Sequence, residues 1–302
     1  MTTAPSTASS PPSRVRTYAS FVRFEHTLFS LPLILAGVFS APGPALSPMR
    51  WLWVAIAAVG ARTAGMSLNR LIDRRIDALN PRTQVRELPA GKMKTGEAVA
   101  LLVGSTAAYL GACAVLGPWF LRVAIVPLAV FTLYPYLKRF TPFCHFGVGL
   151  ALALAPLAGY AAAHPALERP GAALWLGAFA LAWVSGFDII YATLDEKFDR
   201  SHGIHSMVAW LGRDRALRVS WLLHLAAAGA LARVALSTMA HTTASMAWAV
   251  VAVLLYAGTL ALLWLEQRWA EDVNLAFFQI NVWVGAAVLA MVLAARMAAG
   301  GF

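Results

Sequence analysis

The sequence predicts an all-α protein that crosses a membrane several times, and two observations carry this prediction. Of its 302 residues, 60% are hydrophobic and only 13% are charged, whereas a soluble domain carries about a quarter charged residues. Its apolar segments are also long enough to cross a bilayer, which takes about 20 residues in a helix. The mean hydropathy of +0.66 agrees with both. We therefore expect a polytopic helical membrane protein.

Nine apolar segments define the expected membrane helices. They lie at 26–41, 51–72, 96–117, 119–136, 145–163, 171–194, 214–238, 244–265 and 274–298. Pro and Gly interrupt several of them, which membrane helices tolerate where neighbours satisfy the freed backbone groups. The Ser-, Thr- and Pro-rich start of the chain indicates a disordered tail over 1–15. Residues 16–302 are expected to form a single transmembrane domain.

The basic residues predict how the chain sits in the membrane. A net charge of +10 would suggest nucleic-acid binding in a soluble protein, but the sequence holds no nucleic-acid motif. Lys and Arg collect in the cytoplasmic loops of membrane proteins. With the N-terminus inside, that side gathers seven basic residues from Arg70 to Lys94 and the pair Lys138 and Arg139. We expect the N-terminus and the long loops after the second and sixth helices to be cytoplasmic, in the inner (cytoplasmic) membrane.

Acidic residues mark the cytoplasmic end of the second expected helix. Asn69, Asp73 and Asp77 are four residues apart, so they share nearly one face of a helix that repeats every 3.6 residues. Like charges at this spacing repel each other. A divalent metal ion would turn that repulsion into a binding site. Alone, such a motif could also be a solvated helix end.

A second acidic window lies at the cytoplasmic end of the sixth expected helix. Asp188, Tyr191, Asp195 and Asp199 are spaced by three, four and four residues, which again predicts one helical face. With Glu196, six of the 14 acidic residues fall in the two windows. Ionisable residues in membrane helices usually mark function. The repeated plan, an acidic helix end followed by a basic loop, favours a shared site over two solvated ends.

The two windows together predict a diphosphate site. Carboxylate and amide oxygens suit Mg²⁺, which commonly bridges protein carboxylates to substrate phosphates. The neighbouring cations could take the remaining phosphate charge, Arg through bidentate contacts. These cations are Arg82, Arg86, Lys92, Lys138 and Arg139. The apolar helices beneath could then hold a lipid chain. His202 and His205 lack a convincing metal-ligand spacing, and the remaining histidines are expected to be structural: His26, His145, His164, His224 and His241.

Four segments together resemble the UbiA superfamily of intramembrane prenyltransferases. The two windows are similar to its NxxxDxxxD and DxxYxxxDxxxD motifs. RTQVRELPAG at 82–91 resembles its RTxxRxLPxG loop, and YPYLKRFT at 134–141 resembles its YPxxKRxT segment. The match runs from about Arg23 to Gly212 in the right order and spacing. The last three expected helices match only as apolar segments.

The resemblance implies a fold and a reaction. It implies nine helices around a central cavity, with both Asp motifs at its cytoplasmic mouth. In this family, Mg²⁺ held by the Asp motifs binds a prenyl diphosphate, and the allylic carbocation alkylates an electron-rich acceptor. Carried over, the metal ligands and catalytic residues would be Asp73, Asp77, Asp195 and Asp199, with Tyr191 lining the reacting centre. Substrate contacts would come from Asn69, Arg82, Arg86, Lys138, Arg139 and Asp188.

The acceptor is the open part of this interpretation. RFEHT at 23–27 and GIHS at 203–206 depart from the segments of typical 4-hydroxybenzoate enzymes. Together with NPRT at 80–83, these two segments, which contain His26 and His205, look closer to a branch that prenylates a dihydroxynaphthoate in an alternative menaquinone pathway. Partners are therefore expected to be the bilayer, a prenyl diphosphate and a small aromatic acid of ubiquinone or menaquinone biosynthesis, without nucleic acid. The alternatives are a non-quinone acceptor of the haem or chlorophyll type and, from another class, an ion-coupled transporter.

Overall fold

The computed structural model describes residues 13–23, 27–43, 45–239, 244–269 and 273–301. Its regular elements within these ranges are helical, as the sequence predicts. The helices are α1 (Arg14–Phe21), α2 (Thr27–Val38), α3 (Pro48–Leu79), α4 (Thr95–Leu116), α5 (Pro118–Val123), α6 (Ile125–Leu137), α7 (Cys144–Ala163), α8 (Gly171–Ala192), α9 (Glu196–Ser201), α10 (Met207–Leu211), α11 (Arg213–Met239), α12 (Met246–Arg268) and α13 (Val273–Ala298). A 3₁₀ turn at Thr193–Asp195 joins α8 to α9.

Eight of the nine expected membrane helices are long and apolar enough to cross a bilayer within the described residues. The first expected segment, 26–41, corresponds to α2, whose 12 described residues extend about 18 Å at 1.5 Å per residue. This described part is shorter than a hydrocarbon core of about 30 Å. The expectation of nine membrane-spanning helices is therefore not confirmed. The segment 119–136 is divided into α5 and α6 by a turn at Ala124.

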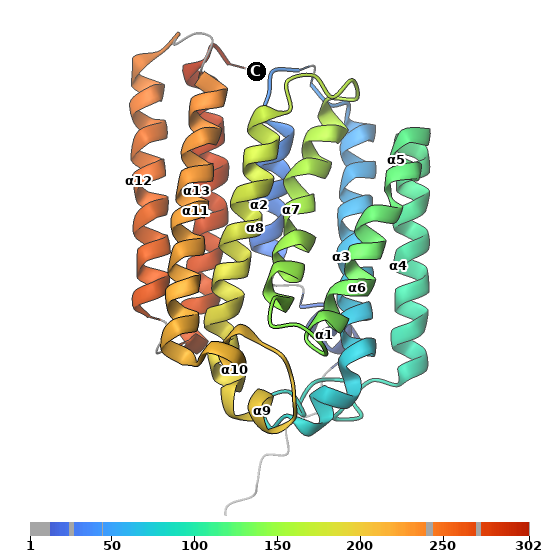
Figure 1. Ribbon diagram of the computed structural model, residues 1–302. Coiled ribbons are helices and arrows are strands. Elements are labelled where there is room, and N and C mark those ends of the chain that lie inside the picture. The colour runs from blue at the N-terminus through green and yellow to red at the C-terminus, as the bar shows by residue number, and fades with distance from the viewer. Residues whose placement is uncertain (1–12, 24–26, 44, 240–243, 270–272, 302) are drawn as a thin grey trace, which may run out of the picture.

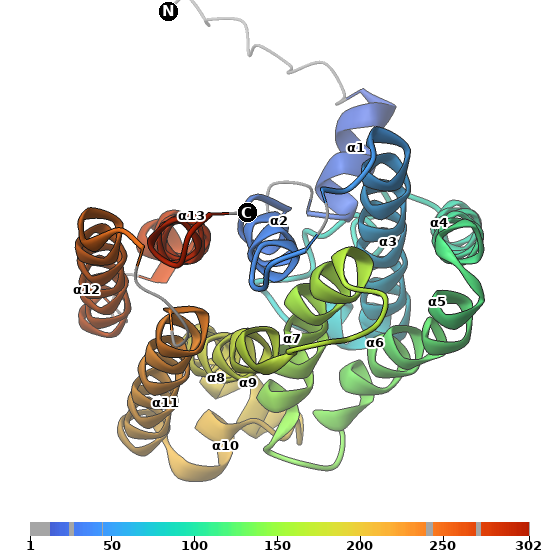
Figure 2. The same ribbon diagram turned by 90° about the horizontal axis from the view of Figure 1, so that it is seen from above.

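The long helices run side by side in one bundle (Figure 1), and the view from above separates their neighbours (Figure 2). The helix α7 packs against α2, α6 and α8, while α8 packs against α11. The helix α3 lies between α4 and α6, and α12 packs on α13 at the other margin. The short helices α1, α9 and α10 gather at one end, the lower end in Figure 1. That end also carries both acidic windows.

Glycines allow α2 and α7 to cross at very short range. A Cβ atom at Gly159 would lie 2.0 Å from the carbonyl oxygen of Ile34, and one at Gly37 would lie 2.0 Å from that of Pro156. Any side chain at either position would have to displace backbone. Small residues at helix crossings replace hydrophobic attraction by close van der Waals packing, which dominates between helices in lipid. The short helix α2 is thus fixed against α7.

The helix α8 is the most enclosed of the candidate spans, with 72% of its apolar window buried. Phe179 and Trp183 stack at 5.4 Å between ring centroids within the core. Leu231 of α11 and Met291 of α13 pack in the same cluster and are fully buried. Because helices surround α8, its polar end is held in a fixed place.

The length of α3 places the first acidic window. Its 32 residues extend about 48 Å, well beyond a hydrocarbon core of about 30 Å. Ser47 caps its start by accepting the backbone N–H of Arg50, and Asn80 follows its last residue. One end of α3 therefore projects past the apolar layer, and Asp73 and Asp77 lie on those last turns.

Candidate active site

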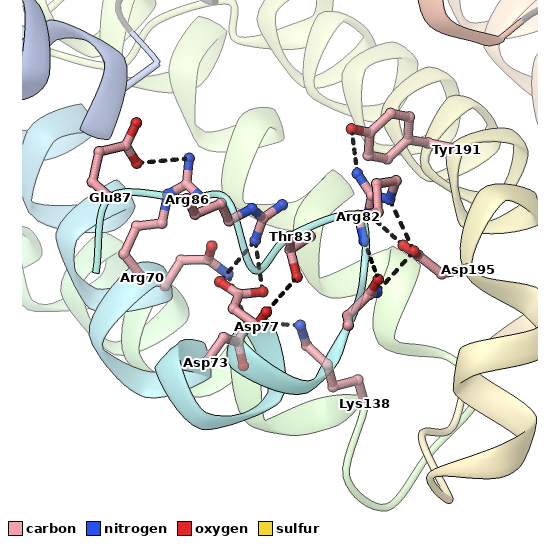
Figure 3. A network of polar contacts seen from close by, with 12 residues as sticks. Arg70, Asp73, Asp77, Arg82, Thr83, Arg86, Glu87, Lys138, Tyr191 and Asp195 are labelled. Atoms are coloured by element: carbon pink, nitrogen blue, oxygen red, sulfur yellow. Dashed lines mark hydrogen bonds and ion pairs between the residues drawn. The ribbon is translucent and has the colours of Figure 1, made fainter. Parts of the chain in front are cut away.

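Polar residues from both halves of the chain meet in one network of contacts (Figure 3). Asp73 and Asp77 of α3 are buried, with exposures of 1% and 5%. The loop between α3 and α4 crosses in front of them and reaches Tyr191 and Asp195. The basic loop thus links the two windows, because Arg86 contacts Asp77 and Arg82 contacts Asp195 (Figure 3).

Asp73 is held by the turn between α6 and α7. Its Oδ2 accepts hydrogen bonds from Lys138 Nζ at 2.7 Å and from Asn69 Nδ2 at 3.1 Å. Arg139 Nη2 lies 3.7 Å from Oδ1 and donates to the carbonyl oxygen of Ile72 at 2.9 Å. Burial lowers the pKa of Lys138, but the charge and hydrogen bond of Asp73 outweigh it, so the pKa of Lys138 is raised above its ordinary value. Lys138 is therefore a cation at neutral pH.

Asp77 is paired with Arg86 in the loop. Arg86 Nη1 donates to both carboxylate oxygens, at 2.8 and 2.9 Å. Thr83 Oγ1 donates to the carbonyl oxygen of Asp77 at 3.0 Å. Charge-assisted hydrogen bonds of this kind are about twice as strong as neutral ones. They fold the loop back onto the last turn of α3.

The Asn80-Pro81 turn explains why the loop takes this path. The side-chain oxygen of Asn80 accepts the backbone N–H of Arg82 at 2.9 Å, and its carbonyl oxygen accepts those of Thr83 and Gln84. Asn forms such local turns readily, and a proline after it cannot continue the helix. The side chains of Arg82 and Arg86 consequently point to different windows (Figure 3).

Arg82 connects the loop to the second window. It donates to Asp195 Oδ1 from Nε at 2.9 Å, to Asp195 Oδ2 from Nη2, and to the hydroxyl oxygen of Tyr191 from Nη1 at 2.7 Å. Asn80 Nδ2 also donates to Asp195 Oδ1, at 2.9 Å. Burial lowers the pKa of Arg82, but the hydrogen bond and charge of Asp195 raise it above its ordinary value overall. Its guanidinium carbon lies 4.7 Å from the centre of the Tyr191 ring.

The second window is not one continuous helical face. Asp188 and Tyr191 belong to α8, Asp195 ends the 3₁₀ turn, and Asp199 belongs to α9. A 3₁₀ turn has about 3.0 residues per turn, so it changes the direction in which the later side chains point. Asp199 is buried. The prediction of a single face holds for the first two residues only.

Sequence reasoning missed His145, which lies against Asp188. Its Nδ1 is 2.6 Å from Asp188 Oδ2, and its Nε2 accepts the backbone N–H of Met207 at 3.2 Å. The sequence predicts a structural histidine here, and the contact with Asp188 joins residues 43 positions apart that spacing along the chain could not pair. The side chain of His205 is exposed, and its backbone N–H donates to the carbonyl oxygen of Lys138 at 2.7 Å. His26 lies outside the described residues.

Three of the site carboxylates, Asp73, Asp77 and Asp195, are each paired with a basic side chain. The described residues contain no group of three or more His, Cys, Asp or Glu side chains that is arranged to hold a metal ion. The donor set nevertheless suits Mg²⁺, because carboxylate and amide oxygens are its preferred protein ligands. Asp73 Oδ1 is also buried and accepts no hydrogen bond from a described residue. These residues therefore fit a hard divalent cation. Its binding requires that Lys138, Arg86 and Arg82 move away from the carboxylates they now contact.

Fold and site define a class: a helical membrane protein with an acidic and basic site at one end of its bundle. Comparison with known proteins makes this specific, because the UbiA prenyltransferase family matches residues 30–285. The chain belongs to this family, and it is a multi-pass membrane prenyltransferase. This answers the transporter alternative in favour of an enzyme.

Individual relatives agree with the family assignment. The 4-hydroxybenzoate octaprenyltransferase of Shewanella frigidimarina is 29% identical over 222 residues, which cover 72% of this chain and 76% of that protein. The apo structure of a UbiA homologue from Aeropyrum pernix K1 is 34% identical, with a TM-score of 0.78 over 89% of this chain and 97% of that chain. A UbiA homologue from Archaeoglobus fulgidus, bound to GPP and Mg²⁺, is 19% identical with a TM-score of 0.70 over 94% and 99%. The last likeness is one of fold.

Proposed function

We propose that the protein transfers a prenyl group from a prenyl diphosphate to a small aromatic acid, with Mg²⁺ as cofactor, in quinone biosynthesis. One observation carries the proposal: Asp73, Asp77 and Asp195 are each paired with a cation, and these cations have the chemistry of diphosphate ligands. The Archaeoglobus relative, solved with GPP and Mg²⁺, supports the donor and the metal. The Shewanella relative supports an aromatic acid as acceptor.

Substrate binding would exchange partners within the site. Asp73, Asp77, Asp195 and Asp199 would hold the metal, with Asn69 and Asp188 supporting them. Bound there, Mg²⁺ would supply Lewis-acid neutralisation of the diphosphate charge. Arg82, Arg86, Lys138 and Arg139 would turn from the carboxylates to the diphosphate oxygens. Each charge keeps a partner throughout, so the exchange avoids the cost of leaving a buried ion unpaired.

The chemistry of transfer balances without a further reactant. The allylic C–O bond breaks and the diphosphate leaves with the electron pair. A new C–C bond forms to the aromatic ring, and the ring carbon then loses its proton, which the departing diphosphate can accept. Arg82, placed between Tyr191 and Asp195, stabilises the negative charge that develops on the leaving group. The face of the Tyr191 ring is suited to the allylic cation.

We propose 4-hydroxybenzoate or a dihydroxynaphthoate as the acceptor, each supported by a different observation. The Shewanella relative is named for 4-hydroxybenzoate. The departures at 23–27 and 203–206 favour the naphthoate. A haem or chlorophyll precursor is the third outcome of the test. We further propose that the site faces the cytoplasm from the inner membrane, because the basic residues collect on its side.

A two-stage experiment tests this function. Purified protein is first heated with geranyl diphosphate, with and without Mg²⁺, and we expect the unfolding temperature to rise only when both are present. Membranes are then incubated with labelled prenyl diphosphate, Mg²⁺ and each acceptor in turn: the two aromatic acids, a haem precursor and a chlorophyll precursor. We expect labelled product with one of the two acids, and its loss on adding EDTA. A diphosphate that stabilises equally without metal, or transfer that survives chelation, would refute the metal-dependent proposal.

A further inference from the structure

His145 joins three elements at the edge of the site. Its imidazole, on α7, lies 2.6 Å from Asp188 Oδ2 on α8 and 3.2 Å from the backbone nitrogen of Met207 on α10. The imidazole side chain is 3% exposed, whereas that of Asp188 is 27% exposed. The ring is therefore enclosed by protein, and the carboxylate it contacts is open on its other side.

The contact with Met207 fixes which ring nitrogen carries the proton. A backbone N–H only donates, so Nε2 must accept and cannot carry a hydrogen. The proton of the neutral ring then sits on Nδ1, which donates to Asp188. Ser206, one residue earlier, caps α10 by accepting the backbone N–H of Ala209 at 3.1 Å. The capped start of α10 holds the Met207 amide, and through it the imidazole, in place.

The hydrogen bond from His145 restrains the Asp188 carboxylate. It occupies Oδ2 and limits rotation of the group, which leaves Oδ1 available to a ligand. Asp188 lies three residues before Tyr191 on α8, so the two side chains are neighbours on the helix. Tyr191 in turn contacts Arg82 of the proposed diphosphate site. A ligand held by Asp188 would thus lie beside the proposed reacting centre.

We propose that His145 is a positioning residue that holds Asp188 so that Oδ1 accepts a hydrogen bond from a hydroxyl group on the acceptor ring. The inference rests on the proposed function and narrows its acceptor to hydroxylated aromatic acids. A hydrogen bond from a ring hydroxyl to a carboxylate is charge-assisted. It raises the electron density of the ring, which attack by an allylic cation requires.

The test separates positioning from folding by two substitutions of one residue. His145→Phe keeps a ring but removes the donor, whereas His145→Asn keeps an amide N–H near the position of Nδ1. His202→Asn, a change of an exposed histidine near α9, is the matched control. For each variant we would measure kcat, both KM values and the unfolding temperature. We would use the hydroxylated acceptor and its O-methyl ether.

For His145→Phe we expect kcat/KM for the hydroxylated acceptor to fall about tenfold to a hundredfold, the range for a hydrogen bond to a charged group. The KM of the prenyl diphosphate should change less than twofold. His145→Asn should recover most of the loss, and the discrimination against the methyl ether should shrink only in His145→Phe. His202→Asn should match the wild type throughout.

Two results would overturn the inference. One is an unchanged kcat/KM for the acceptor in His145→Phe. The other is an equal loss in His145→Phe and His145→Asn that follows the unfolding temperature and affects both substrates alike. Failure of the proposed function is distinguishable from either, because the wild type itself would then transfer no prenyl group to any aromatic acid.

Discussion

Arg82 offers the sharpest test of partner exchange, because its side chain links the basic loop to the second acidic window. It donates two hydrogen bonds to Asp195 and one to Tyr191. A hydrogen bond to a charged group contributes about 1.5–3 kcal/mol. Arg82 and Asp195 are 29% and 15% exposed, so water replaces part of each contact and the lower end applies. Two such contacts, moved to the diphosphate, contribute about 3 kcal/mol.

This magnitude sets the expected kinetics of the substitutions. Arg82→Ala should lower kcat/KM for the prenyl diphosphate about a hundredfold, since 1.4 kcal/mol is tenfold. Arg82→Lys keeps the charge without the planar fork, and it should lose about tenfold. The assay is transfer of labelled prenyl diphosphate under first-order conditions, with exposed Arg215 changed to Ala as the control.

The same substitution should also act on the protein without substrate. Arg82→Ala leaves the Asp195 carboxylate with Asn80 as its remaining donor among the hydrogen bonds described above, so the unfolding temperature should fall. Adding Asp195→Asn to Arg82→Ala should restore part of the lost unfolding temperature. A buried carboxylate without its arginine destabilises the fold more than the loss of both charges does. An Arg82→Ala protein that stays folded and keeps kcat/KM within twofold of the wild type would refute the reasoning.

The remaining predictions concern other parts of the molecule. Asp73→Asn should abolish transfer and the Mg²⁺-dependent thermal shift, whereas exposed Asp214→Asn should alter neither; transfer by the first variant would contradict the metal assignment. Gly159→Ala should destabilise strongly, since its Cβ would meet backbone at 2.0 Å, while Gly111→Ala, with nothing within 4 Å, should not; similar unfolding temperatures would disprove the crossing. The raised pKa of Lys138 means that its pair with Asp73 stabilises fully below the ordinary lysine value and weakens only as pH rises through the raised one. The difference in unfolding temperature between wild type and Lys138→Met should therefore stay constant from pH 6 to pH 9, roughly the range in which a lysine remains charged.

The sequence was sufficient for the membrane helices that depend on hydrophobic length alone. Eight of the expected segments correspond to candidate membrane-spanning helices in the described residues. A run of about 20 apolar residues is long enough to cross a bilayer as a helix, so hydrophobic length alone predicts it. The exception, α2, depends on contacts that hydropathy does not register. Its place follows from the short crossings at Gly37 and Gly159, and those pairings join residues far apart in the chain.

The candidate site was predictable in its members and less so in its contacts. Spacing brought Asp73 and Asp77 to one helix face, because i and i+4 neighbours follow from helix geometry alone. The bridge from Arg82 to Asp195 joins residues 113 positions apart, and its partner choice depends on the Asn80 turn. The contacts of His145 could not be predicted from spacing either, because its partners Asp188 and Met207 lie on other helices, α8 and α10.

Charge balance explains why the site is built from pairs. A group of carboxylates at the end of membrane helices would repel itself and would pay for burial without its ligand. Lys138, Arg86 and Arg82 remove that repulsion in the protein alone. A metal ion by itself would have to displace these cations, and a diphosphate by itself would have to compete with carboxylates. Bound together, each satisfies the partner that the other releases, so metal and diphosphate should bind with positive cooperativity.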